Sequence, residues 1–439
     1  MGNHPAAFDL TTCARPNILA LKPYRCARDD YEDDGVNILL DANENAYGPG
    51  LQIDSRNGFV SARHQAAIQP LISNETAAHL NRYPDPRQTD LKHLLCQFRN
   101  THHHTVKELS PENLFVGVGS DEAIDILLRC FCAPGKDKIL TCPPTYGMYA
   151  VSAQVNDLEV INVPLDASNA FSLRPAAINQ TLSQNPAIKV LYICSPGNPT
   201  ATLIKKGDLQ EVLEHPTWNG VIVVDEAYID FSPEGSSLAE WVTEWPNLVV
   251  MQTLSKAFGL AGIRLGIAFT SPAIARLLNN VKAPYNISST TSALASAAFQ
   301  KGNLAVMQGH CEKILQQRER MLRELPEIPG VGRFLGGHAS NFLLVELLDL
   351  PRQEGGQPSN EVALAVYKAL AETKGIVVRF RGAELGCFGC LRMTVGTEKE
   401  VDELLAKLRV VLQDIYQNRK TVGQVEEREA EIEANDVVA

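Results

Sequence analysis

The chain contains QTLSKAFGLAGIRLG at residues 252–266, a segment in which one lysine stands among small and apolar residues. Lys256 follows a serine, and Arg264 lies eight positions further along. A lysine in a partly dry pocket loses its proton more readily and can then act as a nucleophile. The segment therefore predicts a reactive lysine, and the residues that precede it indicate which chemistry it serves.

Upstream of this segment, two apolar runs end in polar residues. Val221–Val224 is followed by Asp225, with Tyr228 three positions later, and residues 190–194 lead into SPGNPT, which contains Asn198. Continuous apolar runs of this kind predict strands that are buried on both faces, as in a parallel sheet between helices. Ligands of open α/β sheets bind beyond the carboxyl ends of the strands. We therefore expect Asp225, Tyr228 and Asn198 to converge there.

Lysine, aspartate, asparagine, tyrosine and arginine in this arrangement indicate a pyridoxal phosphate site with Lys256 as its Schiff-base lysine. Asp225 suits the pyridine nitrogen, because an opposite charge at hydrogen-bond distance favours the protonated form of that nitrogen. Asn198 and Tyr228 could donate to the phenolic oxygen of the ring. Each residue alone has an ordinary structural interpretation, as a strand cap, a turn or a core side chain. The indication comes from their joint occurrence.

The phosphate of such a cofactor needs backbone amides and cations. The segment GVGSDE, residues 117–122, predicts a strand-to-helix turn whose glycines allow close approach and whose helix N-terminus presents free N–H groups. Asp121 would repel a phosphate unless its carboxylate faces away. Ser255 and Arg264 could offset that repulsion.

The composition excludes several classes of protein. The 439 residues are 45% hydrophobic and 21% charged, which predicts a globular protein of two or three domains. The net charge of −11 argues against a nucleic-acid partner, and no apolar stretch approaches the roughly 18 residues of a membrane span. Ten scattered cysteines are typical of reduced thiols, so we expect a cytoplasmic protein. We interpret Cys387-x-x-Cys390 as structural and the run His102–His104 as a surface loop, and we expect no metal site.

The pattern along the chain predicts an α/β fold with a large and a small domain. Residues 1–50 are expected to form an N-terminal arm that packs on the small domain and the active site. Residues 51–315 predict a large domain with a mainly parallel sheet between helices. Residues 316–418 predict a smaller α+β domain, and the glutamate-rich residues 419–439 predict a disordered tail.

Individual elements follow from the same pattern. Strands are expected in the large domain at 114–116, 139–140, 160–161, 190–194, 221–224, 248–251 and 265–269, and in the small domain at 342–345, 376–378 and 391–395. Helices are expected after Ser120, at about 304–325, around 360–373 and around 398–417.

Several motifs together resemble the fold-type I pyridoxal phosphate-dependent aminotransferases, and more narrowly the histidinol-phosphate aminotransferase family. They are LDANENAYGP (40–49), RYPDP (82–86), GVGSDE (117–122), SPGNPT (195–200), VVDEAYIDF (223–231), TLSKAFGLAGIRLG (253–266) and CLRMTVGT (390–397). The likeness runs from about Pro16 to about Leu412. Residues 55–79 and 351–358 and the acidic tail fit it poorly and look like insertions.

The resemblance implies a role for each matching residue. Lys256 would carry the Schiff base and shuttle the proton, Asp225 would pair with the pyridinium, and Tyr146 would stack on the ring. The phenolic oxygen would be bound by Asn198 and Tyr228. The phosphate would be held by Gly119, Ser120, Asp121, Ser255 and Arg264, with Thr253 nearby. Tyr83 would reach the phosphate of the neighbouring subunit's cofactor, which implies a homodimer.

The resemblance also implies the reaction, a ping-pong transfer of the amino group between L-histidinol phosphate and 2-oxoglutarate in histidine biosynthesis. Arg392 and Arg379 would hold the acidic group of the substrate, with Arg381 as the alternative to Arg379. A planar guanidinium binds carboxylate and phosphate alike. Tyr24 and Asn45 would help to close the pocket and exclude water.

Other functions stay open at this point. The nearest alternatives are an aromatic amino acid aminotransferase and an amino-acid-phosphate decarboxylase of the same fold. A decarboxylase would release carbon dioxide and would need no keto acid. A third alternative is a cofactor-binding protein without catalysis, which would exchange no amino group with any donor.

Overall fold

The computed structural model describes residues 15–22, 27–31, 36–51 and 80–436, except for the side chains of residue 28 and of residues 418–436. The described residues belong to two compact units, one from residues 1–25 and 48–311 and one from residues 26–47 and 312–439. The segment predicted as one N-terminal arm is therefore divided between the units. No helix within the described ranges is long and apolar enough to cross a membrane.

The first unit contains a seven-stranded sheet in the order β2-β8-β7-β6-β5-β3-β4. Its strands are β2 (Leu114–Val118), β3 (Lys138–Thr141), β4 (Glu159–Asn162), β5 (Ile188–Cys194), β6 (Val221–Asp225), β7 (Leu248–Thr253) and β8 (Leu265–Thr270). Strands β4, β3, β5, β6 and β7 pair in parallel, whereas β8 is antiparallel to both β7 and β2. The predicted, mainly parallel sheet is confirmed, and each of the seven apolar runs contributes one strand.

The strand directions bring several chain segments to one edge of this sheet. Because β8 alone is antiparallel, its first residue lies at the same edge as the last residues of the other six strands. The register shows this directly, since Val118 pairs with Leu265 and Cys194 pairs with Asp225. We call this side the carboxyl edge of the sheet.

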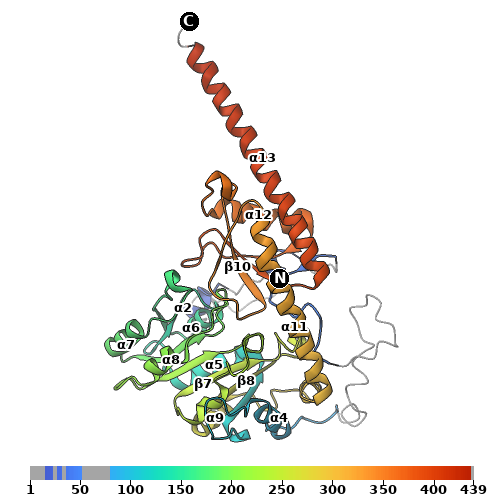
Figure 1. The fold of residues 1–439 in the computed structure, drawn as a ribbon. Helices are drawn as coiled ribbons and strands as arrows, with labels where there is room; N and C mark the ends of the chain where they lie inside the picture. The colour runs from blue at the N-terminus through green and yellow to red at the C-terminus, as the bar shows by residue number, and fades with distance from the viewer. Residues whose placement is uncertain (1–14, 23–26, 32–35, 52–79, 437–439) are drawn as a thin grey trace, which may run out of the picture. The chain divides into compact units, whose positions relative to one another are not determined.

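Helices of the first unit cover the sheet (Figure 1). They are α2 (Pro16–Leu19), α4 (Thr89–Arg99), α5 (Gly119–Phe131), α6 (Met148–Val155), α7 (Pro175–Gln184), α8 (Lys206–Leu213), α9 (Pro272–Val281) and α10 (Ser289–Ala298). Helix α5 contacts β2, β5, β7 and β8, and it buries Ala123, Ile124 and Leu127 in the core. These positions lie on one helical face, as the apolar spacing predicts. Helix α11 (Lys301–Glu324) contains the boundary between the units.

The second unit contains an antiparallel sheet in the order β12-β13-β10-β9 and a parallel pair of β1 with β11. The strands are β1 (Ile38–Leu39), β9 (Val331–Leu335), β10 (Phe342–Leu347), β11 (Ile376–Val377), β12 (Arg379–Phe380) and β13 (Cys390–Thr394), and the helices are α12 (Asn360–Lys374) and α13 (Glu398–Asp436). The predicted strands correspond to β10, β11 and β13. Helix α13 continues through most of the segment expected to be a disordered tail, because glutamate, alanine and lysine favour a helix even without an apolar stripe.

Candidate active site

The predicted cofactor residues gather at the carboxyl edge of the seven-stranded sheet. Asp225 is the last residue of β6, and Asn198 follows β5. Lys256 follows β7, and Gly119 follows β2 as the first residue of α5. Arg264 directly precedes β8, so the antiparallel strand brings it to the same edge. This edge therefore unites residues that are up to about 145 positions apart in the sequence.

Asp225 is a buried carboxylate with two hydrogen-bond donors. The Tyr149 hydroxyl donates to Oδ2 at 2.7 Å, and the Ala227 N–H donates to Oδ1 at 3.1 Å. Burial raises the pKa of Asp225 to about 6, while the hydrogen bonds and the charge of Lys256 act in the opposite direction. A carboxylate removed from water in this way favours a cation beside it.

Tyr149 is a site residue that sequence reasoning missed. Its ring stacks on Tyr192 at a centroid distance of 4.7 Å and meets Tyr146 edge-on at 5.6 Å. The motif PPTYGMY contains both Tyr146 and Tyr149, but only the first was assigned a role. The sequence feature that could have indicated Tyr149 is its position near the start of a helix, three residues after the predicted ring-stacking residue Tyr146.

Lys256 lies in the turn after β7 and is half-buried. Its Nζ is 5.8 Å from the centroid of the buried Tyr228 ring. Thr253 fixes the start of this turn, because its hydroxyl donates to the Leu265 carbonyl at 3.0 Å and accepts from the Ser255 N–H at 3.2 Å. These contacts hold the start of the turn that contains Lys256 against β8.

The turn from β2 into α5 comes very close to β8. Gly119 has φ of +72°, and a Cβ there would lie 2.7 Å from an Arg264 guanidinium nitrogen. A Cβ on Gly266 would lie 2.2 Å from the Gly119 carbonyl carbon. Arg264 itself has φ of 54°, a conformation that costs a non-glycine residue of order 1–3 kcal/mol. The two glycines thus allow Arg264 to lie beside the N-terminus of α5.

Asp121 is oriented toward two neighbours at this turn. The Tyr146 hydroxyl donates to its Oδ1 at 3.2 Å, and its Oδ2 is 3.6 Å from an Arg264 nitrogen. Both members of this ion pair are partly exposed, so the attraction between them is modest. The arrangement nevertheless links Tyr146, Asp121 and Arg264, which were predicted to belong to one site.

Tyr83 lies on the surface of the first unit, with 81% of its area exposed. Its ring stacks on Tyr285 at 4.5 Å with an interplanar angle of 17°. Tyr24, which was predicted to help close the substrate pocket, lies outside the described residues.

The predicted substrate residues Arg392, Arg379 and Asn45 belong to the second unit. Arg392 in β13 is buried, donates to the Asp41 carbonyl and lies 5.4 Å from the Phe342 ring centroid. Arg379 in β12 is its direct cross-strand partner.

Arg381 and Asn45 each have a polar partner within the second unit. Arg381, the alternative to Arg379, forms an ion pair with Glu384 at 2.8 Å. Asn45 is buried and accepts from the Tyr47 N–H at 3.0 Å.

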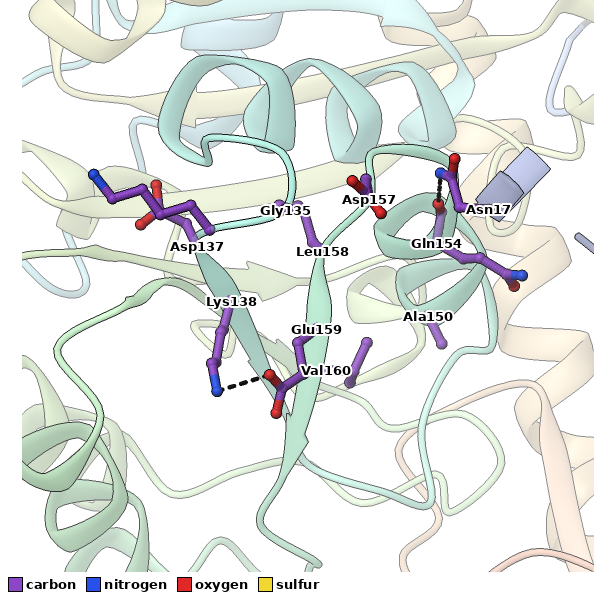
Figure 2. A pocket seen from close by; sticks show the side chains of 11 residues that line it. Asn17, Gly135, Asp137, Lys138, Ala150, Gln154, Asp157, Leu158, Glu159 and Val160 are labelled. Carbon is purple, nitrogen blue, oxygen red and sulfur yellow. Dashed lines mark hydrogen bonds and ion pairs between the residues drawn. The ribbon is translucent and has the colours of Figure 1, made fainter. Parts of the chain in front are cut away.

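A pocket of about 520 Å³ lies elsewhere in the first unit (Figure 2). It includes Lys138 and Glu159, the first residues of β3 and β4, so it lies at the edge opposite the carboxyl edge. These two side chains form an ion pair at 2.7 Å, and the Asn17 amide donates to the Gln154 carbonyl at 2.7 Å. The pocket contains none of the predicted site residues, and ligands of open α/β sheets bind at the other edge.

Comparisons with known proteins identify the family and support the fold. Residues 38–408 match the family described as aminotransferase class I and II. The chain is 50% identical to a histidinol-phosphate aminotransferase of Schizosaccharomyces pombe over 93% of its length and 99% of the relative's. It is also 50% identical to one of Candida maltosa, over 93% of this chain and all of the relative. The crystal structure of a histidinol-phosphate aminotransferase from Sinorhizobium meliloti, in complex with pyridoxal-5′-phosphate, aligns with a TM-score of 0.75 at 21% identity and covers 93% of this chain and 99% of that chain.

Proposed function

The chain belongs to the class I and II aminotransferase family, and on this premise we propose that it transfers the amino group between L-histidinol phosphate and 2-oxoglutarate in histidine biosynthesis. The products would be imidazole acetol phosphate and L-glutamate. The identity of 50% with named histidinol-phosphate aminotransferases over 93% of the chain carries this proposal. The use of 2-oxoglutarate as the amino acceptor rests on the family resemblance.

The enzyme depends on pyridoxal phosphate, and the residues at the carboxyl edge fit this cofactor. Burial raises the pKa of the Asp225 carboxylate to about 6, and a cationic ring nitrogen beside it would stabilise its ionised form. The N-terminus of α5 and Arg264 offer N–H donors and a positive charge for a phosphate. When bound, the cofactor supplies a ring that accepts the electron pair left on the substrate carbon after proton removal.

We assign the following roles on this basis. Asp225 would hold the proton of the ring nitrogen, Asn198 and Tyr228 would donate to the phenolic oxygen, and Tyr146 would lie against the ring face. The phosphate would be held by Gly119, Ser120, Asp121, Thr253, Ser255 and Arg264. Asp121 tolerates the phosphate because its carboxylate is turned to Tyr146 and Arg264.

Lys256 attaches the cofactor and moves the proton. The half-buried Lys256 has its Nζ beside the Tyr228 ring at the carboxyl edge of the sheet, where the cofactor would bind. Once released by the incoming amine, the Lys256 Nζ would take the proton from the substrate carbon that bears the nitrogen and would deliver it to the cofactor carbon on the other side of that nitrogen. Both half-reactions use the same amine, so ping-pong kinetics are expected.

Arg392 and Arg379 would bind the acidic group of each substrate. They are direct partners in an antiparallel pair, so their side chains leave the same face of the sheet. A guanidinium can bind a carboxylate or a phosphate through two parallel hydrogen bonds, so either arginine suits both substrates. We prefer Arg379 to Arg381 as the second arginine, because Arg379 pairs directly with Arg392 in the sheet. Asn45 and Tyr24 would contribute to closing the pocket.

The active form would be a cytoplasmic homodimer. The exposed Tyr83, supported from behind by the Tyr285 ring, would reach the phosphate of the cofactor in the neighbouring subunit. The described cysteines carry free thiols, which supports a reducing compartment.

The substrate assignment is tested by the amino donor that the loaded enzyme accepts. L-Histidinol phosphate, L-tyrosine and L-histidinol are supplied separately with 2-oxoglutarate, and glutamate formation and carbon dioxide release are measured. We expect glutamate from histidinol phosphate at a kcat/KM at least about 100-fold above that of the other donors. Equal use of tyrosine would make the protein an aromatic aminotransferase. Carbon dioxide without glutamate would make it a decarboxylase, and no product from any donor would contradict the enzyme assignment.

A further inference from the structure

We propose that Tyr149 is a positioning residue that orients the Asp225 carboxylate toward the cofactor and favours its charged form. The inference rests on the proposed function, because it matters only if a pyridinium ion binds beside Asp225. It adds a residue to the site that none of the predicted roles includes.

The hydrogen bonds around Asp225 fix its carboxylate in one orientation. Tyr149 donates to Oδ2 at 2.7 Å, and the Ala227 N–H donates to Oδ1 at 3.1 Å. Each oxygen therefore has its own donor, and rotation about the side-chain bond would break both contacts. A carboxylate oxygen accepts more than one hydrogen bond, so Asp225 can still accept one from a ring nitrogen.

The Tyr149 ring is itself held rigidly. It is fully buried, and it stacks on the equally buried Tyr192 at 4.7 Å with an interplanar angle of 10°. The Tyr192 hydroxyl donates instead to the Ile124 carbonyl of α5 at 3.1 Å. The two stacked tyrosines thus have matched burial, but only Tyr149 has its hydroxyl on the carboxylate.

The surrounding charges show what the hydroxyl does electrostatically. Burial and the charge of Asp121 raise the pKa of Asp225, while the Tyr149 hydrogen bond, the Ala227 N–H and the charge of Lys256 lower it. Burial and the nearby Asp225 raise the pKa of Tyr149 well above its usual value, so Tyr149 remains a donor. Burial also raises the pKa values of Tyr192 and Cys194, which therefore stay neutral beside Asp225. Without the Tyr149 hydroxyl, Asp225 would be protonated more easily.

The test measures the affinity of the full-length apoenzyme for pyridoxine 5′-phosphate by calorimetry. This probe has the ring and the phosphate but no aldehyde, so it forms no bond with Lys256. Tyr149→Phe is expected to raise the Kd about 10-fold at about pH 6.5, because more of Asp225 is then protonated. At about pH 8.5, where Asp225 is ionised in both proteins, we expect a change of less than about threefold. The control Tyr192→Phe is expected to stay within about twofold of wild type at both pH values.

Equal losses in the two phenylalanine variants would overturn the proposal, because they would point to packing alone. A Tyr149→Phe loss of the same size at both pH values would overturn it as well. In an Asp225→Asn background, where no charge remains to be favoured, Tyr149→Phe should have no pH-dependent effect.

A second variant keeps the proposal testable if Tyr149→Phe does not fold. Tyr149→His retains a ring N–H donor and is expected to bind the probe within about threefold of wild type at about pH 8.5. A pH profile for this variant that matches Tyr149→Phe would contradict the proposal, as would a loss of binding with a native circular dichroism spectrum. Failure of the wild-type apoenzyme to bind pyridoxine 5′-phosphate would instead contradict the proposed function.

Discussion

Asp225 and Glu226 are adjacent acidic residues at the end of β6, and both are buried, yet their surroundings differ. Glu226 accepts from the Ser237 hydroxyl at 2.7 Å, the Leu238 N–H at 2.6 Å and the Gln252 amide at 2.8 Å. Asp225 accepts from the Tyr149 hydroxyl and the Ala227 N–H. Burial raises the pKa of both, to about 6 for Asp225 and about 7 for Glu226.

The difference separates a functional carboxylate from a structural one. Successive residues of a strand point to opposite faces, so one step along the chain moves the side chain into different surroundings. Glu226 lies in a network of protein donors, and the charge of Arg99 favours its ionised form. Asp225 lies at the carboxyl edge with Lys256, where a ligand can complete its environment.

The largest expected effect is on turnover. Asp225→Asn is expected to lower kcat roughly 10³-fold, because a neutral amide no longer holds the proton of the ring nitrogen. Glu226→Gln is expected to keep kcat within about 10-fold of wild type, since this side chain contacts only protein. Steady-state assays with saturating substrates and excess cofactor measure both. Equal losses in the two variants would remove the distinction between the carboxylates.

Removal of the Glu226 side chain should destabilise the protein more than removal of the Asp225 side chain. This order is the reverse of the order expected for turnover. Glu226→Ala leaves the donors of Ser237, Leu238 and Gln252 without their acceptor and is expected to cost about 3–5 kcal/mol of unfolding free energy. Asp225→Ala leaves fewer donors and removes a desolvated charge, so about 1–3 kcal/mol is expected. Urea denaturation of the apoproteins provides the values. A larger loss for Asp225→Ala would contradict this account.

The titration of Glu226 should make the unfolding free energy depend on pH. The native-state pKa of Glu226, about 7, exceeds the ordinary value of 4.5, so the folded protein binds the extra proton between these pH values. The resulting stabilisation is complete below about pH 4.5 and is lost as the pH rises through about 7. The unfolding free energy of wild type minus that of Glu226→Gln is expected to fall by about 2–3 kcal/mol from about pH 5 to about pH 8. A difference that stays constant over this range would show that Glu226 does not titrate in the folded protein.

The smallest effect concerns one donor of the structural network. Ser237→Ala removes a single hydroxyl from Glu226 and is expected to cost about 1–2 kcal/mol of unfolding free energy. The kcat of the folded enzyme should not change, because Ser237 belongs to the network around Glu226. Thermal denaturation and a turnover assay on the same preparation test both statements, and a marked fall in kcat would connect this network to catalysis.

Much of the first unit could be predicted because its strands are continuous apolar runs that end in polar residues. The run 221–224 ending in Asp225 is the clearest case, since burial on both faces leaves a simple pattern. Tyr149 was missed because its contact with Asp225 depends on where α6 begins and on how its ring stacks, which a sequence pattern does not encode.

The second unit was less predictable because several of its strands are short. Strands β1 and β12 contain two residues each and have no periodicity to detect. The preference for Arg379 over Arg381 depends on the register of β12 with β13, which is a tertiary feature. The helical extension to Asp436 shows that low hydrophobicity alone did not exclude a helix.

Every role proposed for the site depends on Lys256 as the residue that bears the cofactor. The most direct test is borohydride reduction of the protein loaded with pyridoxal phosphate, followed by mass spectrometry of its peptides. We expect one stoichiometric label, on Lys256, and none in a Lys256→Ala variant. A label on another lysine would contradict this assignment. Lys92 is the most informative competitor, because burial lowers its pKa to about 8 and so favours its neutral form.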